Sequence, residues 1–169
     1  GVRNRAILET LYCCGLRVSE LVGLKISNLF FESGYIKIEG KGSKERLVPI
    51  SSVAIKSINE YLVVMRDKLN IKPGYEDYLF LNRRGSALSR VMVFNVVKEA
   101  AEFAGIHKSV SPHTFRHSFA THLLDGGANL KAVQDMLGHE SIVTTEIYTH
   151  LDTKHLKETL ENCHPRSKY

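Results

Sequence analysis

The sequence predicts a mainly α fold with a small antiparallel sheet, an α+β arrangement in which helices make up most of the chain. Apolar residues recur at helical spacing through most of the 169 residues. Between residues 27 and 50 this spacing gives way to short apolar runs bounded by turn residues, which are typical of strands. No linker, low-complexity tract or repeat divides the chain, so we expect one domain over residues 1–169.

Glycines mark the boundaries of the elements expected in the first half of the chain. Gly15 interrupts the first helix, while Ser33-Gly34 and a glycine-rich segment at 40–44 provide the turns of a three-stranded meander. In chain order, the expected elements are helices over residues 2–14 and 17–24, strands over 29–31, 35–39 and 46–50, and a helix over 54–65.

Capping residues delimit the helices of the second half. Gly105 is a typical C-cap, Ser111 and Pro112 are typical of a helix start, and Asn129 and Gly138 should begin and end another helix. In chain order, the expected elements are an extended piece over residues 78–81 and helices over 93–104, 112–124, 130–137, 141–148 and 153–161.

The charge balance points to an anionic partner. Lys and Arg number 23 against 18 Asp and Glu, which gives a net charge of +5 and a pI near 9.1. Such an excess is compatible with nucleic acid, although many enzymes with other substrates are equally basic. The hydrophobic content of 43% is ordinary for a folded domain and argues against disorder.

Composition also excludes several classes of protein. No apolar run approaches the ~20 residues that a membrane-spanning helix needs, and residues 1–5 lack the apolar stretch of a signal peptide. Cys13, Cys14 and Cys163 are odd in number and include an adjacent pair, which favours reduced thiols. We therefore expect a cytoplasmic protein. Because the sequence begins without Met, we also expect a piece of a longer chain.

The segment around residue 113 carries the first candidate site. His113 and Arg116 lie one helical turn apart, so both side chains point the same way and together can hold an anion. His113 and His117 also have the spacing of a helical metal pair, but no Glu follows His113 as in the zinc-protease motif, which disfavours a metal site. The alternative is that each histidine is a core or capping residue.

Two further clusters contribute cations. Arg17 follows the glycine break among apolar residues, and Glu20, one turn on, is a natural partner that can hold it in place. This pair could equally be a structural bridge. Lys41 lies at the tip of the glycine-rich hairpin, where glycines allow close approach to a phosphate, although a solvated turn has the same composition.

Together these residues suit phosphoryl transfer to a tyrosine. Arginines can neutralise the non-bridging oxygens, where charge grows in the transition state, and Tyr148 is the tyrosine that stands out after the break at Gly138 and His139. No carboxylate cluster is present to hold magnesium, so fixed cations would replace the metal. We therefore expect no cofactor and no metal.

These residues and their order resemble the catalytic domain of the tyrosine recombinases, the phage-integrase and Xer-type site-specific recombinases. The matching segments are Gly-Leu-Arg-Val-Ser-Glu-Leu with Arg17, Gly-Lys-Gly-Ser-Lys-Glu-Arg with Lys41, Ser-Pro-His-Thr-Phe-Arg-His-Ser-Phe-Ala-Thr-His with His113 and Arg116, and Leu-Gly-His with His139, followed nine residues on by Tyr148. The resemblance covers almost the whole chain. It implies that the N-terminal core-binding domain, with which such enzymes clamp DNA, is absent from this chain.

The resemblance implies a site-specific DNA recombinase or integrase that needs neither ATP nor metal. Tyr148 would attack a DNA phosphodiester, form a 3′-phosphotyrosyl bond and release a 5′-hydroxyl. The other matching residues would assist: Arg17 and Arg116 would hold the scissile phosphate, His113 would take part in proton transfer from the tyrosine, His139 would donate to a non-bridging oxygen, and Lys41 would protonate the leaving 5′-oxygen.

The expected partner is double-stranded DNA, bound by a tetramer of protomers on synapsed DNA in the nucleoid. We expect contacts to the DNA backbone from basic residues near the site, namely Lys44, Arg46, Arg83, Arg84 and Arg90. For Arg83 and Arg84, an exposed loop without DNA contact is an equal alternative. Leu156 and Leu160 form one face of the last helix, which the resemblance implies is exchanged with a neighbouring protomer.

Three other functions are considered. A type IB topoisomerase would use the same chemistry to relax supercoils, but the compact chain and the Xer-like motifs weigh against it. A catalytically silent DNA-binding regulator would keep the fold, but the complete set of six residues argues against loss of catalysis. A phosphohydrolase acting through His113 and Arg116 on small phosphates would not need Tyr148.

Overall fold

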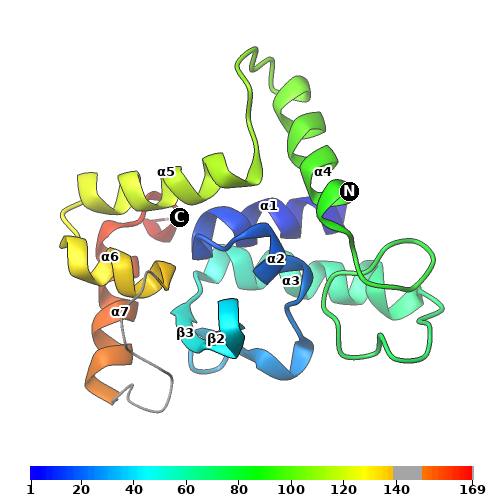
Figure 1. Cartoon of the computed structure of the whole chain (residues 1–169), viewed down its shortest axis with the longest axis horizontal. Coiled ribbons are helices and arrows are strands. Elements are labelled where there is room, and N and C mark those ends of the chain that lie inside the picture. Colours follow the sequence, from blue (N-terminus) through cyan, green and yellow to red (C-terminus); the bar gives the residue numbers. More distant parts are fainter. Residues whose placement is uncertain (139–149, 169) are drawn as a thin grey trace.

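The computed structural model describes residues 1–138 and 150–168 of the chain (Figure 1). It confirms the mainly α fold with a small sheet. The helices are α1 (Val2–Cys14), α2 (Val18–Val22), α3 (Ser52–Val64), α4 (Arg90–Phe103), α5 (Pro112–Asp125), α6 (Leu130–Leu137) and α7 (His150–Cys163). The strands are β1 (Leu29–Phe30), β2 (Tyr35–Glu39) and β3 (Glu45–Pro49). Short 3-10 turns are found at Ile26–Asn28, Lys41–Ser43, Arg66–Lys68 and Pro165–Lys168.

The three strands form the predicted antiparallel meander, in the order β1-β2-β3. Ile36 pairs with Val48, and Ile38 pairs with Arg46, so alternate residues of β2 and β3 share the buried face. The segment 78–81, expected to be extended, is not a continuous strand: it forms isolated bridges at its ends, from Tyr78 to Lys25 and from Leu81 to Ala87, with bends between them. The expected helix over 141–148 lies outside the described residues.

The second predicted helix is shorter than expected, because its ends are fixed by two caps. Arg17 has extended backbone and is the N-cap, and the chain leaves the helix at Gly23. Helices α5 and α6 begin and end close to where the capping residues in the sequence predict. Ser111 forms a capping box with Thr114, the side chain of Asn129 accepts from the amide of Ala132, and Gly138 ends α6 in the left-handed conformation.

The main core surrounds α1, which lies between α3 and α5 (Figure 1). Ile7 and Leu11 on this helix are fully buried, as are the adjacent thiols of Cys13 and Cys14. All three cysteines are free, as predicted. Burial of these apolar side chains on one central helix favours the folded state.

A second, smaller core joins α5, α6 and α7. Phe119, Met136, Leu156 and Leu160 are among its buried members. Gly126 at the end of α5 lies so close to the end of α7 that a Cβ there would overlap the carbonyl of Cys163. In this structure, α7 is therefore packed on its own chain.

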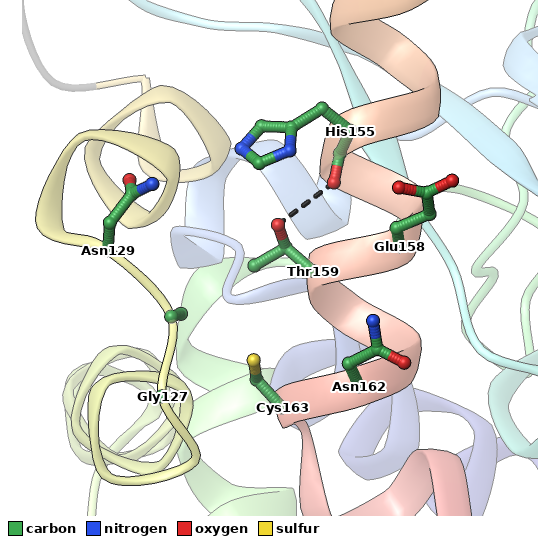
Figure 2. A pocket seen from close by; sticks show the side chains of 8 residues that line it. Gly127, Asn129, His155, Glu158, Thr159, Asn162 and Cys163 are labelled. Carbon is green, nitrogen blue, oxygen red and sulfur yellow. Dashed lines mark hydrogen bonds between the residues drawn. The ribbon is translucent and has the colours of Figure 1, made fainter.

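A small cavity of about 210 Å³ remains beside this contact, between the α5–α6 connection and α7 (Figure 2). Gly127 and Asn129 line one side, and His155, Glu158 and Asn162 of α7 line the other (Figure 2).

Each helix in the described ranges is too short or too polar to cross a bilayer.

Candidate active site

The Arg17 loop is shaped by a glycine. Gly15 ends α1 in the left-handed region (φ 65°), and a Cβ there would overlap the ring of Phe119 on α5. Leu16 is then buried, and Arg17 begins α2 with 44% of its side chain exposed. The glycine break thus turns the chain so that Arg17 reaches the surface beside α5.

Glu20 lies at the centre of the site, buried with only 5% of its surface exposed. Its Oε1 accepts from the backbone amide of Arg17 at 2.8 Å. Arg46 donates two hydrogen bonds to the carboxylate, from Nη1 to Oε2 at 2.5 Å and from Nη2 to Oε1 at 3.0 Å. The guanidinium nitrogens of Arg17 and Arg116 each lie 3.8 Å from a Glu20 oxygen. One carboxylate therefore faces three guanidinium groups.

The electrostatics of the cluster favour an anion. Burial alone would raise the pKa of Glu20, but the hydrogen bonds and charge of Arg46, with the charge of Arg116, lower it overall. Burial, together with the positive charge of Arg17, lowers the pKa of Arg116 to about 10. Positive charge remains in excess over the single carboxylate, so an anion such as a phosphate would be stabilised beside the cluster.

Arg116 is held by the backbone on both sides. It lies on the buried side of α5 and donates from Nη1 to the carbonyl of Gly15 at 2.7 Å and from Nη2 to the carbonyl of Leu137 at 2.6 Å. These bonds fix its orientation relative to the Arg17 loop and to the end of α6. His113 lies one turn earlier on α5 and is exposed.

The other two histidines of α5, His117 and His122, are not part of the arginine cluster. His117 is exposed. His122 lies 2.5 Å from the hydroxyl of Tyr12 through its Nδ1. Among the residues that the structure describes, no group of three metal-binding side chains lies together.

The hairpin between β2 and β3 carries Lys41. Its turn contains Gly42 and Ser43 in the left-handed region, and Lys41 is exposed at the start of it. The hairpin closes with a hydrogen bond from the amide of Gly40 to the carbonyl of Lys44 at 2.6 Å. A Cβ at Gly40 would lie 3.6 Å from both Arg46 Nη1 and Glu20 Oε2, so the base of the hairpin rests on this ion pair.

The structure therefore brings together three of the residues singled out from the sequence as candidates for the site. Arg17, Glu20 and Arg116 form one cluster, and the hairpin with Lys41 begins beside it. His113 belongs to the helix that supplies Arg116. The placements of His139 and Tyr148 lie outside the described residues, which resume at α7.

The expectation that Arg46 faces DNA is wrong in this structure. Its side chain is 7% exposed, and its guanidinium donates hydrogen bonds to the buried carboxylate of Glu20 and to the carbonyl of Met136. The alternation of β3 contains the signal: Arg46 shares its face with the buried Val48. The other basic residues expected on the surface are exposed, namely Lys44, Arg83, Arg84 and Arg90.

Comparison with known proteins gives a consistent picture. The model of a family described as the phage integrase family matches residues 1–155. Over 165 residues, the chain is 52% identical to the tyrosine recombinase XerD of Chlorobaculum tepidum, covering 98% of this chain and 54% of that protein. The chain thus spans about half the length of the relatives it matches.

Two solved structures are similar along nearly the whole chain. The crystal structure of XerA recombinase has a TM-score of 0.76 and 34% identity, covering 98% of this chain and 59% of that one. The XerH site-specific recombinase, bound to its difH substrate in a pre-cleavage complex, has a TM-score of 0.74 and 36% identity, covering 95% of this chain and 46% of that one.

Proposed function

The chain belongs to the phage integrase family, and on this premise we propose that it supplies the catalytic machinery of a site-specific DNA recombinase. The observation that carries the proposal is the arginine cluster, in which Arg17 and Arg116 face one buried carboxylate and leave positive charge in excess. The relatives' names support the same reaction, since one is a tyrosine recombinase and another is a site-specific recombinase that was solved with its difH substrate.

The proposed reaction exchanges one phosphate ester for another. The phenolic oxygen of Tyr148 attacks the scissile phosphorus, forming a P–O bond to the tyrosine while the bond to the 5′-oxygen breaks. His113 accepts the phenolic proton, and Lys41 gives a proton to the departing 5′-oxygen. Because the phosphotyrosyl ester conserves the bond energy, a 5′-hydroxyl of the partner duplex can reverse the step and reseal the strand without ATP.

The fixed cations have a separate task, which is to stabilise the charge on the non-bridging oxygens. This role is supported by two observations: Glu20 faces the guanidinium groups of both Arg17 and Arg116, and the carbonyls of Gly15 and Leu137 hold Arg116. His139 would donate to one of these oxygens. Because the cations belong to the chain, the reaction as proposed calls for no metal or cofactor.

The proposed partner is double-stranded DNA in the nucleoid. The exposed side chains of Lys44, Arg83, Arg84 and Arg90 would contact the phosphate backbone. Each such contact releases counterions, so binding should weaken steeply with salt. Arg46 does not belong to this set of backbone contacts, because its side chain is buried.

We propose a tetramer on synapsed DNA as the working assembly, held by exchange of α7 between protomers. In this structure, Leu156 and Leu160 pack on α5 and α6 of the same chain, so exchange would place the same leucines in the equivalent site of a neighbour. Truncation after Thr149 removes this contact. A truncated protein that still forms the wild-type synaptic tetramer on DNA would contradict the exchange.

Covalent trapping tests the proposed function. The full-length gene product is incubated with nicked duplexes whose arms are randomised, so that cleavage next to the nick releases a short fragment and traps the enzyme. Wild-type protein should yield detergent-resistant adducts that share a sequence, and Tyr148→Phe should yield none. Adducts that persist in Tyr148→Phe would contradict the assignment of the nucleophile.

The same preparation separates the alternatives. A type IB topoisomerase would relax a supercoiled plasmid that lacks the selected sequence. A silent regulator would bind the selected duplex without forming an adduct. A phosphohydrolase would hydrolyse p-nitrophenyl phosphate equally well with and without the hydroxyl of Tyr148.

A further inference from the structure

We propose that Arg46 is a positioning residue that sets the place of Lys41 relative to the arginine cluster, by joining the base of the hairpin to the end of α6. This inference rests on the proposed function, in which Lys41 protonates the leaving oxygen. It assigns to Arg46 a role inside the site and not on the DNA-facing surface.

The bonds of Arg46 run in two directions at once. Its Nη1 and Nη2 bind Glu20 on α2, and its Nε donates to the carbonyl of Met136 on α6 at 2.9 Å. Arg46 itself belongs to β3, at the foot of the Lys41 hairpin. One guanidinium therefore connects three segments that are far apart in the sequence.

Close packing on both sides leaves this guanidinium little freedom. A Cβ at Gly138, just after α6, would lie 2.9 Å from Cδ of Arg46 and 3.0 Å from its Nη1. On the other side, Gly40 at the base of the hairpin lies against Nη1 and the Glu20 carboxylate. The hairpin base and the α6 end are thus spaced by the thickness of one side chain.

Arg116 is attached to the same end of α6 one residue later, through the carbonyl of Leu137. The carbonyls of Met136 and Leu137 therefore hold two buried arginines, one leading to the hairpin and one to the phosphate-binding cluster. Because Lys41 follows Gly40 directly, a shift of Arg46 displaces Lys41 relative to Arg116. A misplacement of about 1 Å can cost a rate of roughly 100-fold.

Lysine cannot replace Arg46 in this arrangement. A lysine keeps one positive charge beside Glu20, but its single ammonium cannot bind the carboxylate as a fork and also reach Met136 from a separate nitrogen. Arg46→Lys therefore keeps the positive charge at position 46 but removes the hydrogen-bonding geometry of the guanidinium. It should leave Glu20 neutralised while freeing the hairpin base.

The test compares two leaving groups in the trapping reaction. A normal substrate releases a 5′-oxygen and needs a proton from Lys41, whereas a 5′-bridging phosphorothiolate releases a thiolate and needs none. Lys41→Ala should be slow on the oxygen substrate and largely restored on the sulfur substrate. Arg46→Lys should show the same selective loss, by roughly 10- to 100-fold on oxygen with most of the rate restored on sulfur.

Arg66→Lys is the matched control. Arg66 is as deeply buried as Arg46, but within the described part of the chain its hydrogen bonds go to the carbonyls of Glu76, Tyr78 and Leu79, away from the cluster. This variant should lower stability without changing the ratio of oxygen to sulfur rates. If Arg46→Lys does not fold, Gly138→Ala disturbs the same guanidinium while keeping its charge and is assayed in its place.

The outcomes are distinct. Slowing of Arg46→Lys by the same factor on both substrates, or no slowing on either, overturns the positioning role while the proposed function stands. Absence of any adduct from the wild-type protein on both substrates overturns the proposed function and the positioning role with it.

Discussion

Arg116 donates a hydrogen bond from its Nη2 to the backbone carbonyl of Leu137 across 2.6 Å, joining the middle of α5 to the end of α6. A second bond from its Nη1 to the carbonyl of Gly15 fixes the other side of the same guanidinium. Both acceptors are backbone carbonyls, so the fold of the main chain itself holds the guanidinium of Arg116 in place.

Arg116→Lys should therefore lose much of the activity, although the substitution conserves the positive charge. A lysine cannot satisfy two carbonyls on opposite sides and also face a phosphate. We expect the rate of adduct formation to fall by roughly 100-fold or more, which is the usual cost of losing a preorganised donor at a developing negative charge. A rate within a few-fold of wild type would show that the orientation of this side chain is unimportant.

Glu20→Gln should destabilise the protein and alter its acid unfolding. Removal of the carboxylate leaves Arg46 and Arg116 buried without a counter-charge, at a cost of about 3 kcal/mol in the free energy of unfolding at pH 7. The measurement is denaturant unfolding over a range of pH.

The sign of the pH effect follows from the lowered pKa of Glu20, relative to its ordinary 4.5. Its contribution to stability is complete above that value and is lost as the pH falls through the folded-state pKa. Wild-type stability should therefore fall more steeply below pH 4.5 than that of Glu20→Gln. Parallel curves for the two proteins would contradict the pairing.

Gly138→Ala should cost more stability than Gly105→Ala. Both glycines have nearly the same positive φ, 69° and 72°, so the backbone penalty is matched. A Cβ at Gly138 meets Arg46, whereas a Cβ at Gly105 meets nothing within 4 Å. Thermal or denaturant unfolding of the two variants measures the difference, which should exceed the strain of ~1 kcal/mol that they share. Equal losses would mean that Arg46 moves aside without cost.

Docking of the C-terminal segment should weaken as the pH falls. His164 is fully buried, its Nδ1 accepts from the amide of Arg166, and its Nε2 lies 3.2 Å from the carbonyl of Tyr12. Burial lowers the pKa of His164, as do the charges of His122 and Arg166, whereas the carbonyl of Tyr12 and the charge of Glu9 oppose this. A protonated ring would also turn Nδ1 from an acceptor into a donor against the amide.

Amide hydrogen exchange checks this prediction. Because the pKa is lowered on folding, the contribution is present above the ordinary value of 6.5 and lost below it. Protection of residues 160–166 should decrease between pH 7.5 and 5.5, after correction for the intrinsic exchange rate. His164→Gln keeps a donor and an acceptor without titrating, so its protection should stay constant. Constant protection in the wild-type protein would contradict the prediction.

Much of the fold is predictable from local signals. The ends of α1, α5 and α6 follow from Gly15, Ser111, Asn129 and Gly138, because each of these residues satisfies backbone groups that a helix end leaves unpaired. The meander follows from its turns. These features depend on a few adjacent residues, and for that reason sequence alone suffices.

The interior of the site is not local and was only partly predicted. The pairing of Arg17 with Glu20 follows from their spacing, but the bonds of Arg46 and Arg116 to α6 join residues 90 and 21 positions apart in the sequence. A positive charge on a hairpin is usually solvated, so the sequence favours an exposed position for Arg46. Only its alternation with Val48 on the buried face of β3 indicated otherwise.

Identification of the residue joined to DNA tests the central claim most directly. Trapped adducts are digested with nuclease and protease, and the peptide that carries the remaining nucleotide is sequenced by mass spectrometry. We predict a 3′-phosphate esterified to Tyr148, in the peptide that follows His139. Attachment to another residue, or a 5′-linked phosphate, would contradict the account.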